Sequence, residues 1–212
     1  MPDIETARGW YAAADAVHDF DHVLRVYRMA ERLAAAEGAD LEIVRAAALL
    51  HDAEGAAPGV GQARAAHHHA SAEFAAEVLS AEGWLPERIA AVQHCIRSHR
   101  YRDQSEPPST IEAKVLFDAD KLDVLGAIGA ARVIAYAALI GNPFYFPPSD
   151  QFLSTGREVN GEPHSAYHEH LFKLRKVRER MFTAAAQAIA DERLRFLDEF
   201  FERLIDEWQG SR

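Results

Sequence analysis

Hydrophobic side chains recur every three or four residues along most of the chain, which is the spacing of one face of an α-helix. No alternating run rich in Val, Ile and Thr stands out, so strands are not expected. The pattern predicts an all-α protein, with helices near residues 4–16, 22–38, 41–53, 67–83, 86–99, 109–126 and 127–140 and two more within 165–208.

Residues that favour helix ends lie at several of these boundaries. Gly38 can terminate the second predicted helix, Asp40 can cap the third, and Pro86 suits the first turn of the fifth. Ser109 and Glu112 have the spacing of a capping box, which predicts that the next helix begins there.

Residues 141–165 interrupt the helical pattern with four aromatic residues and four prolines. An irregular segment of this length in a compact domain is typical of a lid or a binding loop. After it, one helical face carries a stripe of apolar residues that is expected to be buried: Leu194, Leu197, Phe201 and Leu204.

The formal net charge is −10, and no basic stripe interleaved with aromatic residues is visible. Nucleic-acid polymers are therefore not expected as partners, because binding them usually needs a basic patch. A small anionic ligand stays compatible with this charge, since a bound metal ion can supply positive charge locally.

Three features favour a cytoplasmic protein with no membrane partner. Cys95 is the only cysteine, which excludes an internal disulfide and a thiolate metal site. The first ten residues lack the apolar core of a signal peptide. The longest apolar run, residues 124–141, contains Arg132 in its middle and is interpreted as a buried helix.

The stretch "AAALLHDAEG" places His51 and Asp52 directly after five apolar residues. His51 shares a helical face with Val44 and Ala48, so it is expected to point inward. Buried ionisable groups need a partner or a metal. The alternative is a core histidine bonded to a neighbour, with Asp52 turned to solvent.

Further candidate ligands lie on two other predicted helices. His22 opens the second helix, and the sequence "FDADKLD" places carboxylates within an apolar helix. Asp118 and Asp120 each share a face with apolar residues, so periodicity does not choose between them. Two imidazoles and two carboxylates would suit Mn, Fe, Co, Ni or Zn, and Mg less readily. The absence of sulfur ligands argues against a closed structural zinc site.

The segments "HDFDHVLRV", "AALLHDAEG" and "AKVLFDADKLDVLGAIGAARV" resemble the HD-domain metal-dependent phosphohydrolases. The similarity is greatest to a bacterial branch that includes nucleotide pyrophosphohydrolases, and it extends to "YHEHLFKL" and "RMFTAAAQAIADERLRFLDEF". It implies a single HD domain over residues 1–212: a compact helical bundle with a metal-binding core at about 18–140 and a C-terminal helical extension at about 165–208.

The resemblance also implies a ligand set and a reaction. The last ligand of an HD domain is the Asp of an Ala-Asp-basic-Leu unit, which is Asp120 here, and the set becomes His22, His51, Asp52 and Asp120. These residues would hold one divalent ion, with Mn as the first choice and Fe, Co, Ni, Mg or Zn as alternatives. Water activated at the ion would attack phosphorus, with Asp52 as a catalytic residue. The implied substrate is a nucleotide, and the implied reaction is pyrophosphate release from a nucleoside triphosphate.

Other residues are candidates by position. Glu54 follows the doublet and could handle the attacking water, or it could be a solvated loop residue. Candidates for substrate contact, each with a surface or packing role as the alternative, are Arg64, His69, His94, His99 and Lys121. His69 and His94 also fit the order of ligands for a second metal, with Asp52 as the bridge.

Two other function classes stay open. The chain could be a non-catalytic nucleotide or metal sensor, or a di-iron HD oxygenase that uses a second metal. The apolar C-terminal helices could pack internally or form the interface of a homodimer.

Overall fold

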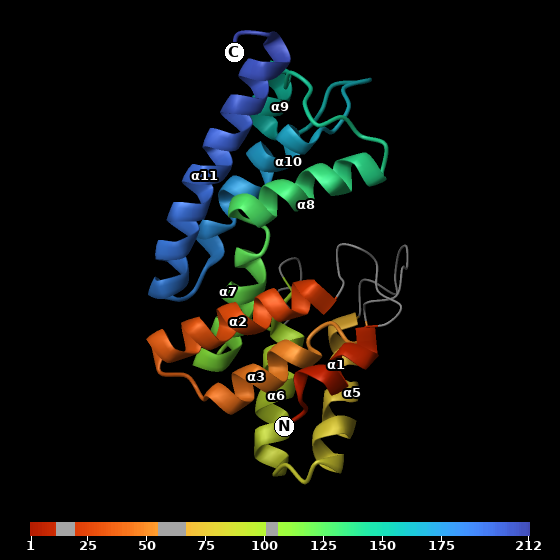
Figure 1. The fold of residues 1–212 in the computed structure, drawn as a ribbon, viewed down its shortest axis with the longest axis vertical. Helices are drawn as coiled ribbons and strands as arrows, with labels where there is room; N and C mark the ends of the chain where they lie inside the picture. The colour runs from red at the N-terminus through yellow and green to blue at the C-terminus, as the bar shows by residue number, and fades with distance from the viewer. Residues whose placement is uncertain (12–19, 55–66, 101–105) are drawn as a thin grey trace. The chain divides into compact units, whose positions relative to one another are not determined.

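The computed structural model describes residues 1–11, 20–54, 67–100 and 106–212. Within these ranges the secondary structure consists of ten α-helices and three short 3-10 helices, and no strand is found (Figure 1). The prediction of an all-α fold is therefore confirmed.

The chain divides into two compact units. Unit 1 contains Met1–Lys121 and Met181–Ala186, and unit 2 contains Leu122–Arg180 and Gln187–Arg212. The helices of unit 1 are α1 (Ile4–Arg8), η1 (Gly9–Tyr11), α2 (Phe20–Glu37), α3 (Leu41–Leu50), α5 (His67–Ala81), α6 (Pro86–Ser98) and α7 (Ile111–Leu122). Those assigned mainly to unit 2 are α8 (Gly126–Leu139), α9 (Asp150–Thr155), α10 (Ala166–Phe172), η2 (Leu174–Lys176), η3 (Arg178–Arg180) and α11 (Ala184–Gln209). The single domain over residues 1–212 stays a prediction.

Most of the predicted helix ends are found. Gly38 follows α2 with a φ of 72°, a left-handed conformation that favours glycine. The Asp40 side chain accepts hydrogen bonds from the amides of Glu42 and Ile43 at 3.0 and 3.2 Å, and Pro86 opens α6.

The predicted capping box at Ser109 and Glu112 is wrong. Helix α7 begins at Ile111, and the Thr110 hydroxyl accepts from the Ala113 amide at 3.2 Å. Ser109 instead contacts His94, and Glu112 accepts from the Asp40 amide at 3.0 Å. Both side chains are engaged by residues distant in sequence, which the local spacing does not reveal.

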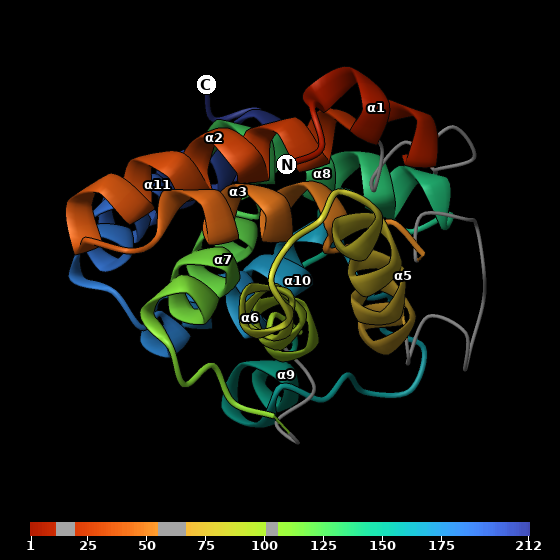
Figure 2. The same cartoon turned by 90° about the horizontal axis from the view of Figure 1, so that it is seen from below.

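Helix α3 is the central helix of unit 1 and contacts α1, α2, α5 and α6 (Figure 2). Its residues are apolar on almost every side, and the whole stretch from Ala46 to Leu50 is buried. This helix brings His51 and Asp52 to its C-terminal end within the unit.

In unit 2, α10 contacts α8, and α11 contributes Leu197 and Phe201 to the core. The rings of Phe201 and His170 stack at 4.6 Å between centroids. The predicted stripe on α11 is found in part, because Leu194 and Leu204 are half-buried.

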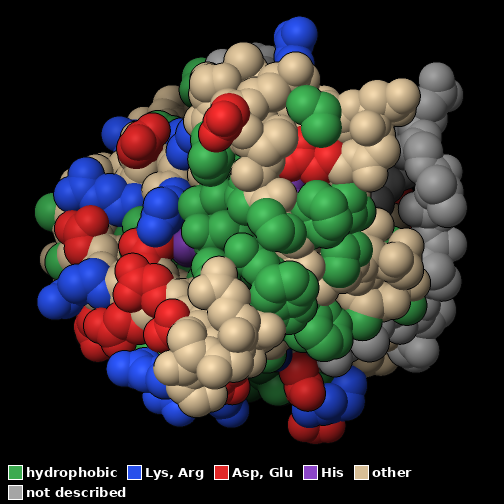
Figure 3. Space-filling view, turned by 90° about the horizontal axis from the view of Figure 1, so that it is seen from above, with side chains coloured by type: hydrophobic (Ala, Val, Ile, Leu, Met, Phe, Trp, Pro, Cys, Tyr) green, Lys and Arg blue, Asp and Glu red, His purple; other side chains and the backbone are tan. Residues whose placement is uncertain are grey.

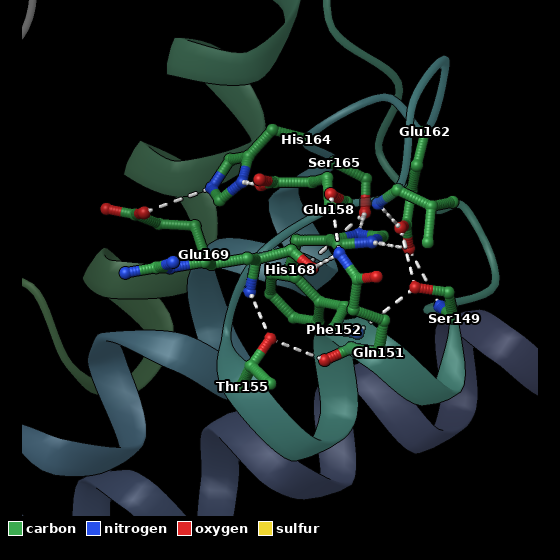
Figure 4. Close-up of polar contacts among 12 residues, drawn as sticks. Ser149, Gln151, Phe152, Thr155, Glu158, Glu162, His164, Ser165, His168 and Glu169 are labelled. Carbon is green, nitrogen blue, oxygen red and sulfur yellow. Dashed lines mark hydrogen bonds and ion pairs between the residues drawn. The ribbon is translucent and has the colours of Figure 1, made fainter.

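A polar network organises the segment between α8 and α10 (Figure 4). The buried Glu162 carboxylate accepts from the amide and hydroxyl of Ser149, both at 2.7 Å, and from the Val159 amide at 2.8 Å. Its fourth partner is His168 Nε2, 3.0 Å away. The Glu162 carboxylate thus links three parts of this segment through hydrogen bonds. A role of the segment as a lid or a binding loop stays a prediction.

This network predicts a pH dependence of stability. Burial raises the pKa of Glu162, but hydrogen bonds from His168 and Ser149 outweigh burial and hold it at about 2, below the ordinary 4.5. A carboxyl with a depressed folded-state pKa stabilises the protein above its unfolded pKa and loses that contribution as pH falls. We expect the Glu162→Gln variant to flatten the decline in unfolding free energy between pH 4.5 and 2, measured by urea denaturation. An unchanged pH profile would contradict this role.

Hydrophobic side chains gather on one face of the molecule (Figure 3). Among the large apolar residues of unit 2, Leu139, Leu153 and Trp208 are 71%, 61% and 63% exposed. No single helix in the described ranges is long and apolar enough to cross a membrane, and only the bent pair α7 and α8, counted together, reaches that length and composition.

Candidate metal centre

The C-terminal end of α3 holds an imidazole that is prepared to bind a ligand. His51 is fully buried, and its Nδ1 lies 2.8 Å from the Ala48 carbonyl, to which it donates. The Nε2 atom therefore carries a lone pair, and it makes no hydrogen bond within the described part of the chain. A buried polar atom without a partner is costly, so this nitrogen is suited to a ligand.

Side chains from three helices meet beside His51. His22, His51 and Asp52 each offer one possible metal-ligand atom, and these three atoms lie within 4.8 Å of one another. Asp52 Oδ2 is 3.6 Å from His51 Nε2, and Asp120 Oδ1 on α7 is 3.5 Å from His22 Nε2. The four residues expected as ligands are thus neighbours in unit 1.

The two candidate aspartates of α7 have different surroundings. The buried Asp118 carboxylate accepts from the amides of Phe182 and Thr183 at 3.0 and 2.8 Å, and from the Thr183 hydroxyl at 2.7 Å. Asp120 lies beside His22 and forms an ion pair with Lys121. The geometry favours Asp120 as the ligand, because Asp118 is already occupied by donors of the same unit.

The electrostatics favour the protonation states that bind metals. Burial lowers the pKa of His51 to about 4, which keeps the imidazole neutral near pH 7. Burial raises the pKa of Asp52, but the imidazoles of His51, His67 and His99 outweigh it and hold that pKa well below its usual range. Burial also opposes ionisation of Asp120, yet Lys121 and His22 lower its pKa. Neutral imidazoles and ionised carboxylates are the forms that ligate a metal.

A second group of possible ligands shares Asp52. Its Oδ1 atom lies 3.2 Å from His67 Nε2 and 3.4 Å from His99 Nε2. His99 Nδ1 donates to the Ile96 carbonyl at 2.5 Å, which directs Nε2 toward the carboxylate. The possible metal-ligand atoms of Asp52, His67 and His99 also lie within 4.8 Å of one another. Asp52 thus stands between two sets of imidazoles.

The contribution of His67 was not foreseen in the sequence, where His69 was the expected member of the triplet. Helix α5 begins at His67, and a residue two positions later is rotated by about 200° around a helix axis. His69 is accordingly exposed. The first turn of a helix near the doublet is the signal that could have identified His67.

Of the remaining candidates, His94 and Glu54 belong to neither ligand group of the described residues. His94 donates from Nδ1 to Glu106 at 2.6 Å and accepts at Nε2 from the Ser109 amide at 3.1 Å. Glu54 is exposed, and its backbone amide donates to the Ser71 hydroxyl at 3.1 Å. Arg64 lies outside the described residues.

The residues present fit a divalent metal. The orphaned Nε2 of His51 lies beside a second imidazole and two ionised carboxylates, a set of nitrogen and oxygen donors that suits Mn and related ions. The Nδ1 atoms of His51 and His99 donate hydrogen bonds to backbone carbonyls, which fixes the orientation of each ring. Metal-ligating histidines commonly make such a hydrogen bond through the nitrogen that does not bind the metal.

Comparisons with known proteins identify the family of the chain. The family model described as the HD domain matches residues 19–125. The uncharacterized protein YpgQ of Bacillus subtilis (strain 168) is 31% identical over 196 residues, which cover 91% of this chain and 85% of YpgQ.

Solved structures show the same fold over nearly the whole chain. YpgQ in complex with ADP has a TM-score of 0.71 and 28% identity, with 97% of each chain covered. An HD-superfamily hydrolase from Bacillus thuringiensis has a TM-score of 0.73 and 29% identity, with 97% of this chain and 94% of that chain covered. The matched range contains all four expected ligands, His22, His51, Asp52 and Asp120. The chain belongs to the HD domain family.

Proposed function

We propose that this protein is a metal-dependent phosphohydrolase that releases pyrophosphate from a nucleoside triphosphate. The observation that carries the proposal is the buried cluster of His22, His51, Asp52 and Asp120, in which His51 Nε2 lacks a hydrogen-bond partner. The description of the Bacillus thuringiensis relative as a hydrolase supports the reaction class. The ADP bound to YpgQ supports a nucleotide as substrate.

In this proposal the four clustered residues hold one divalent ion, with Mn as the first choice. Such an ion supplies Lewis-acid polarisation of a phosphate oxygen and lowers the pKa of a water molecule. Asp52 is oriented by the imidazoles on both of its oxygens, so it can place one oxygen toward the ion and the other toward the water that attacks phosphorus. His67 and His99 are placed to bind a phosphate oxygen or to accept a proton from that water.

The charges of the cluster set the roles of the other residues. Lys121 is paired with Asp120, so we assign it to balancing that carboxylate rather than to direct capture of phosphate. Arg64 and Glu54 keep their proposed roles in phosphate binding and water handling. In this proposal His99 keeps the substrate contact predicted for it. His67, which also lies beside Asp52, takes the contact predicted for His69 and His94, because His69 is exposed and His94 is bonded to Glu106.

The test is a substrate panel with defined metals. Metal-free protein is supplied with Mn, Mg, Fe, Co or Ni and with ribonucleoside and deoxyribonucleoside triphosphates, and both phosphate and pyrophosphate are quantified. We expect pyrophosphate and a nucleoside monophosphate with Mn, and no product after chelation. Release of phosphate alone would assign a different bond, and metal binding without any product would favour the sensor function.

One observation favours a second candidate, a binuclear centre. Asp52 belongs to both ligand groups, so His67 and His99 could hold a second ion with Asp52 as the bridge. Two irons at this place would suit an oxygen-dependent oxidation. Metal analysis separates the candidates, because the phosphohydrolase proposed here requires one ion per chain, whereas the oxygenase requires two and consumes oxygen.

A further inference from the structure

The doublet lies where α3 stops, and the carbonyls of a final helical turn lack partners within the helix. Three consecutive carbonyls here each receive a different donor. His51 Nδ1 donates to Ala48 at 2.8 Å, and the Ala53 amide donates to Leu50 at 3.3 Å. The carbonyl between them, that of Leu49, accepts from the Tyr11 hydroxyl at 2.9 Å.

Tyr11 is the donor that comes from elsewhere in the chain. It precedes Leu49 by 38 residues, ends η1 and is 4% exposed. Its hydroxyl therefore ties the N-terminal segment to the turn that carries the metal-binding doublet. The bond is shielded from solvent, so its loss would leave the Leu49 carbonyl buried without this donor.

The ring of Tyr11 makes a second connection. It packs against Phe20 with 5.6 Å between centroids and an interplanar angle of 48°. Phe20 is the first residue of α2 and lies two positions before His22. One side chain thus contacts both the end of α3, with His51 and Asp52, and the start of α2, with His22.

The electrostatics indicate how close Tyr11 is to the doublet. Burial raises the pKa of Tyr11 well above its ordinary 10.0, and the charge of Asp52 raises it further, while the backbone amide of Asp52 opposes them. The hydroxyl therefore keeps its proton and remains a donor to Leu49.

We propose that Tyr11 is a positioning residue of the metal centre, whose hydroxyl fixes the turn of His51 and Asp52 while its ring holds the start of the helix that carries His22. The inference rests on the proposed function, because it takes these three residues as metal ligands. Tyr11 touches neither reacting atoms nor metal and is not a catalytic residue.

The test measures Mn affinity rather than activity, by isothermal titration calorimetry of metal-free protein. Tyr11→Phe removes the hydroxyl and keeps the ring, and we expect Mn to bind roughly 10-fold more weakly, the lower end of losses seen when outer-shell support is removed. Phe20→Leu removes the ring contact and keeps the hydroxyl, and it is expected to weaken Mn binding as well.

The matched control is Tyr27→Phe, which removes the hydroxyl of another buried tyrosine, one that contacts Glu31 rather than the doublet. We expect this variant to bind Mn as the wild type does. If Tyr27→Phe and Tyr11→Phe lose the same amount of Mn affinity, the loss reflects a general change in protein stability, and the inference is overturned. Wild-type affinity in both Tyr11→Phe and Phe20→Leu would overturn it as well. A wild-type protein that binds none of Mn, Fe, Co, Ni, Mg and Zn would overturn the metal centre, and the proposed function with it.

Discussion

Replacing Asp52 with Asn is expected to lower kcat by a factor on the order of 10³ or more, the scale of loss when a group that acts in the transition state is removed. Asp52 contacts His51 through one oxygen and His67 and His99 through the other. Asn keeps the shape but loses the negative charge and places an NH₂ donor where an imidazole or a metal needs an acceptor. The measurement is pyrophosphate release at saturating Mn and nucleotide.

Asp21→Asn is the control for this variant. Asp21 is adjacent to His22 but exposed, so the substitution removes the same charge near the cluster without touching it. We expect wild-type turnover from Asp21→Asn and an unchanged far-UV circular dichroism spectrum for both variants. Full activity of Asp52→Asn would refute the assignment of Asp52 to the reaction.

The second large effect is expected on stability. Asp118→Ala should lower the unfolding free energy of the metal-free protein by about 3 kcal/mol, because it leaves buried donors without their acceptor. The buried donors are the amide and hydroxyl of Thr183, and the partly buried amide of Phe182 loses the same acceptor. Urea denaturation at pH 7 measures the change.

The neighbouring aspartate of α7 provides the matched comparison. Asp120→Asn removes a carboxylate that lies beside His22 and Lys121 and that, among the residues the structure describes, accepts no backbone hydrogen bond like those of Asp118. It is expected to abolish tight Mn binding and to change the unfolding free energy much less than Asp118→Ala does. Wild-type stability of Asp118→Ala would show that the carboxylate does not hold the 181–183 turn.

The sequence was informative where a local pattern determines the structure. Three- and four-residue spacing predicted most of the helices, but not α9 (Asp150–Thr155), which lies in the segment expected to be irregular. The inward orientation of His51 at the end of α3 followed from the same spacing. Periodicity could not separate Asp118 from Asp120, since both share faces with apolar residues. The distinction depends on Thr183, which contacts Asp118 from 65 residues away.

The histidine assignments illustrate a second limit. His67 and His69 lie in one triplet, and only the start of α5 at His67 decides which of them faces Asp52. His94 was a candidate by its position in the order of histidines along the chain, yet its partners are Glu106 and Ser109, on a segment whose path the sequence does not specify. Such choices depend on where a helix begins and on what packs beside it, rather than on residue type.

The hydrogen bonds of Asp118 have a consequence for how the protein can be divided. Its donors belong to Met181–Ala186, a short segment that returns to unit 1 after the chain has passed through Leu122–Arg180. In the same segment the Ala185 amide donates to Glu37 at 2.9 Å. Leu122–Arg180 is therefore inserted into the sequence of unit 1. Unit 1 consists of Met1–Lys121 and the short segment Met181–Ala186, which follows the insertion. A fragment cut after the family-matched residues would lack that segment, so the metal-binding module is discontinuous and cannot be excised intact as one contiguous stretch of sequence.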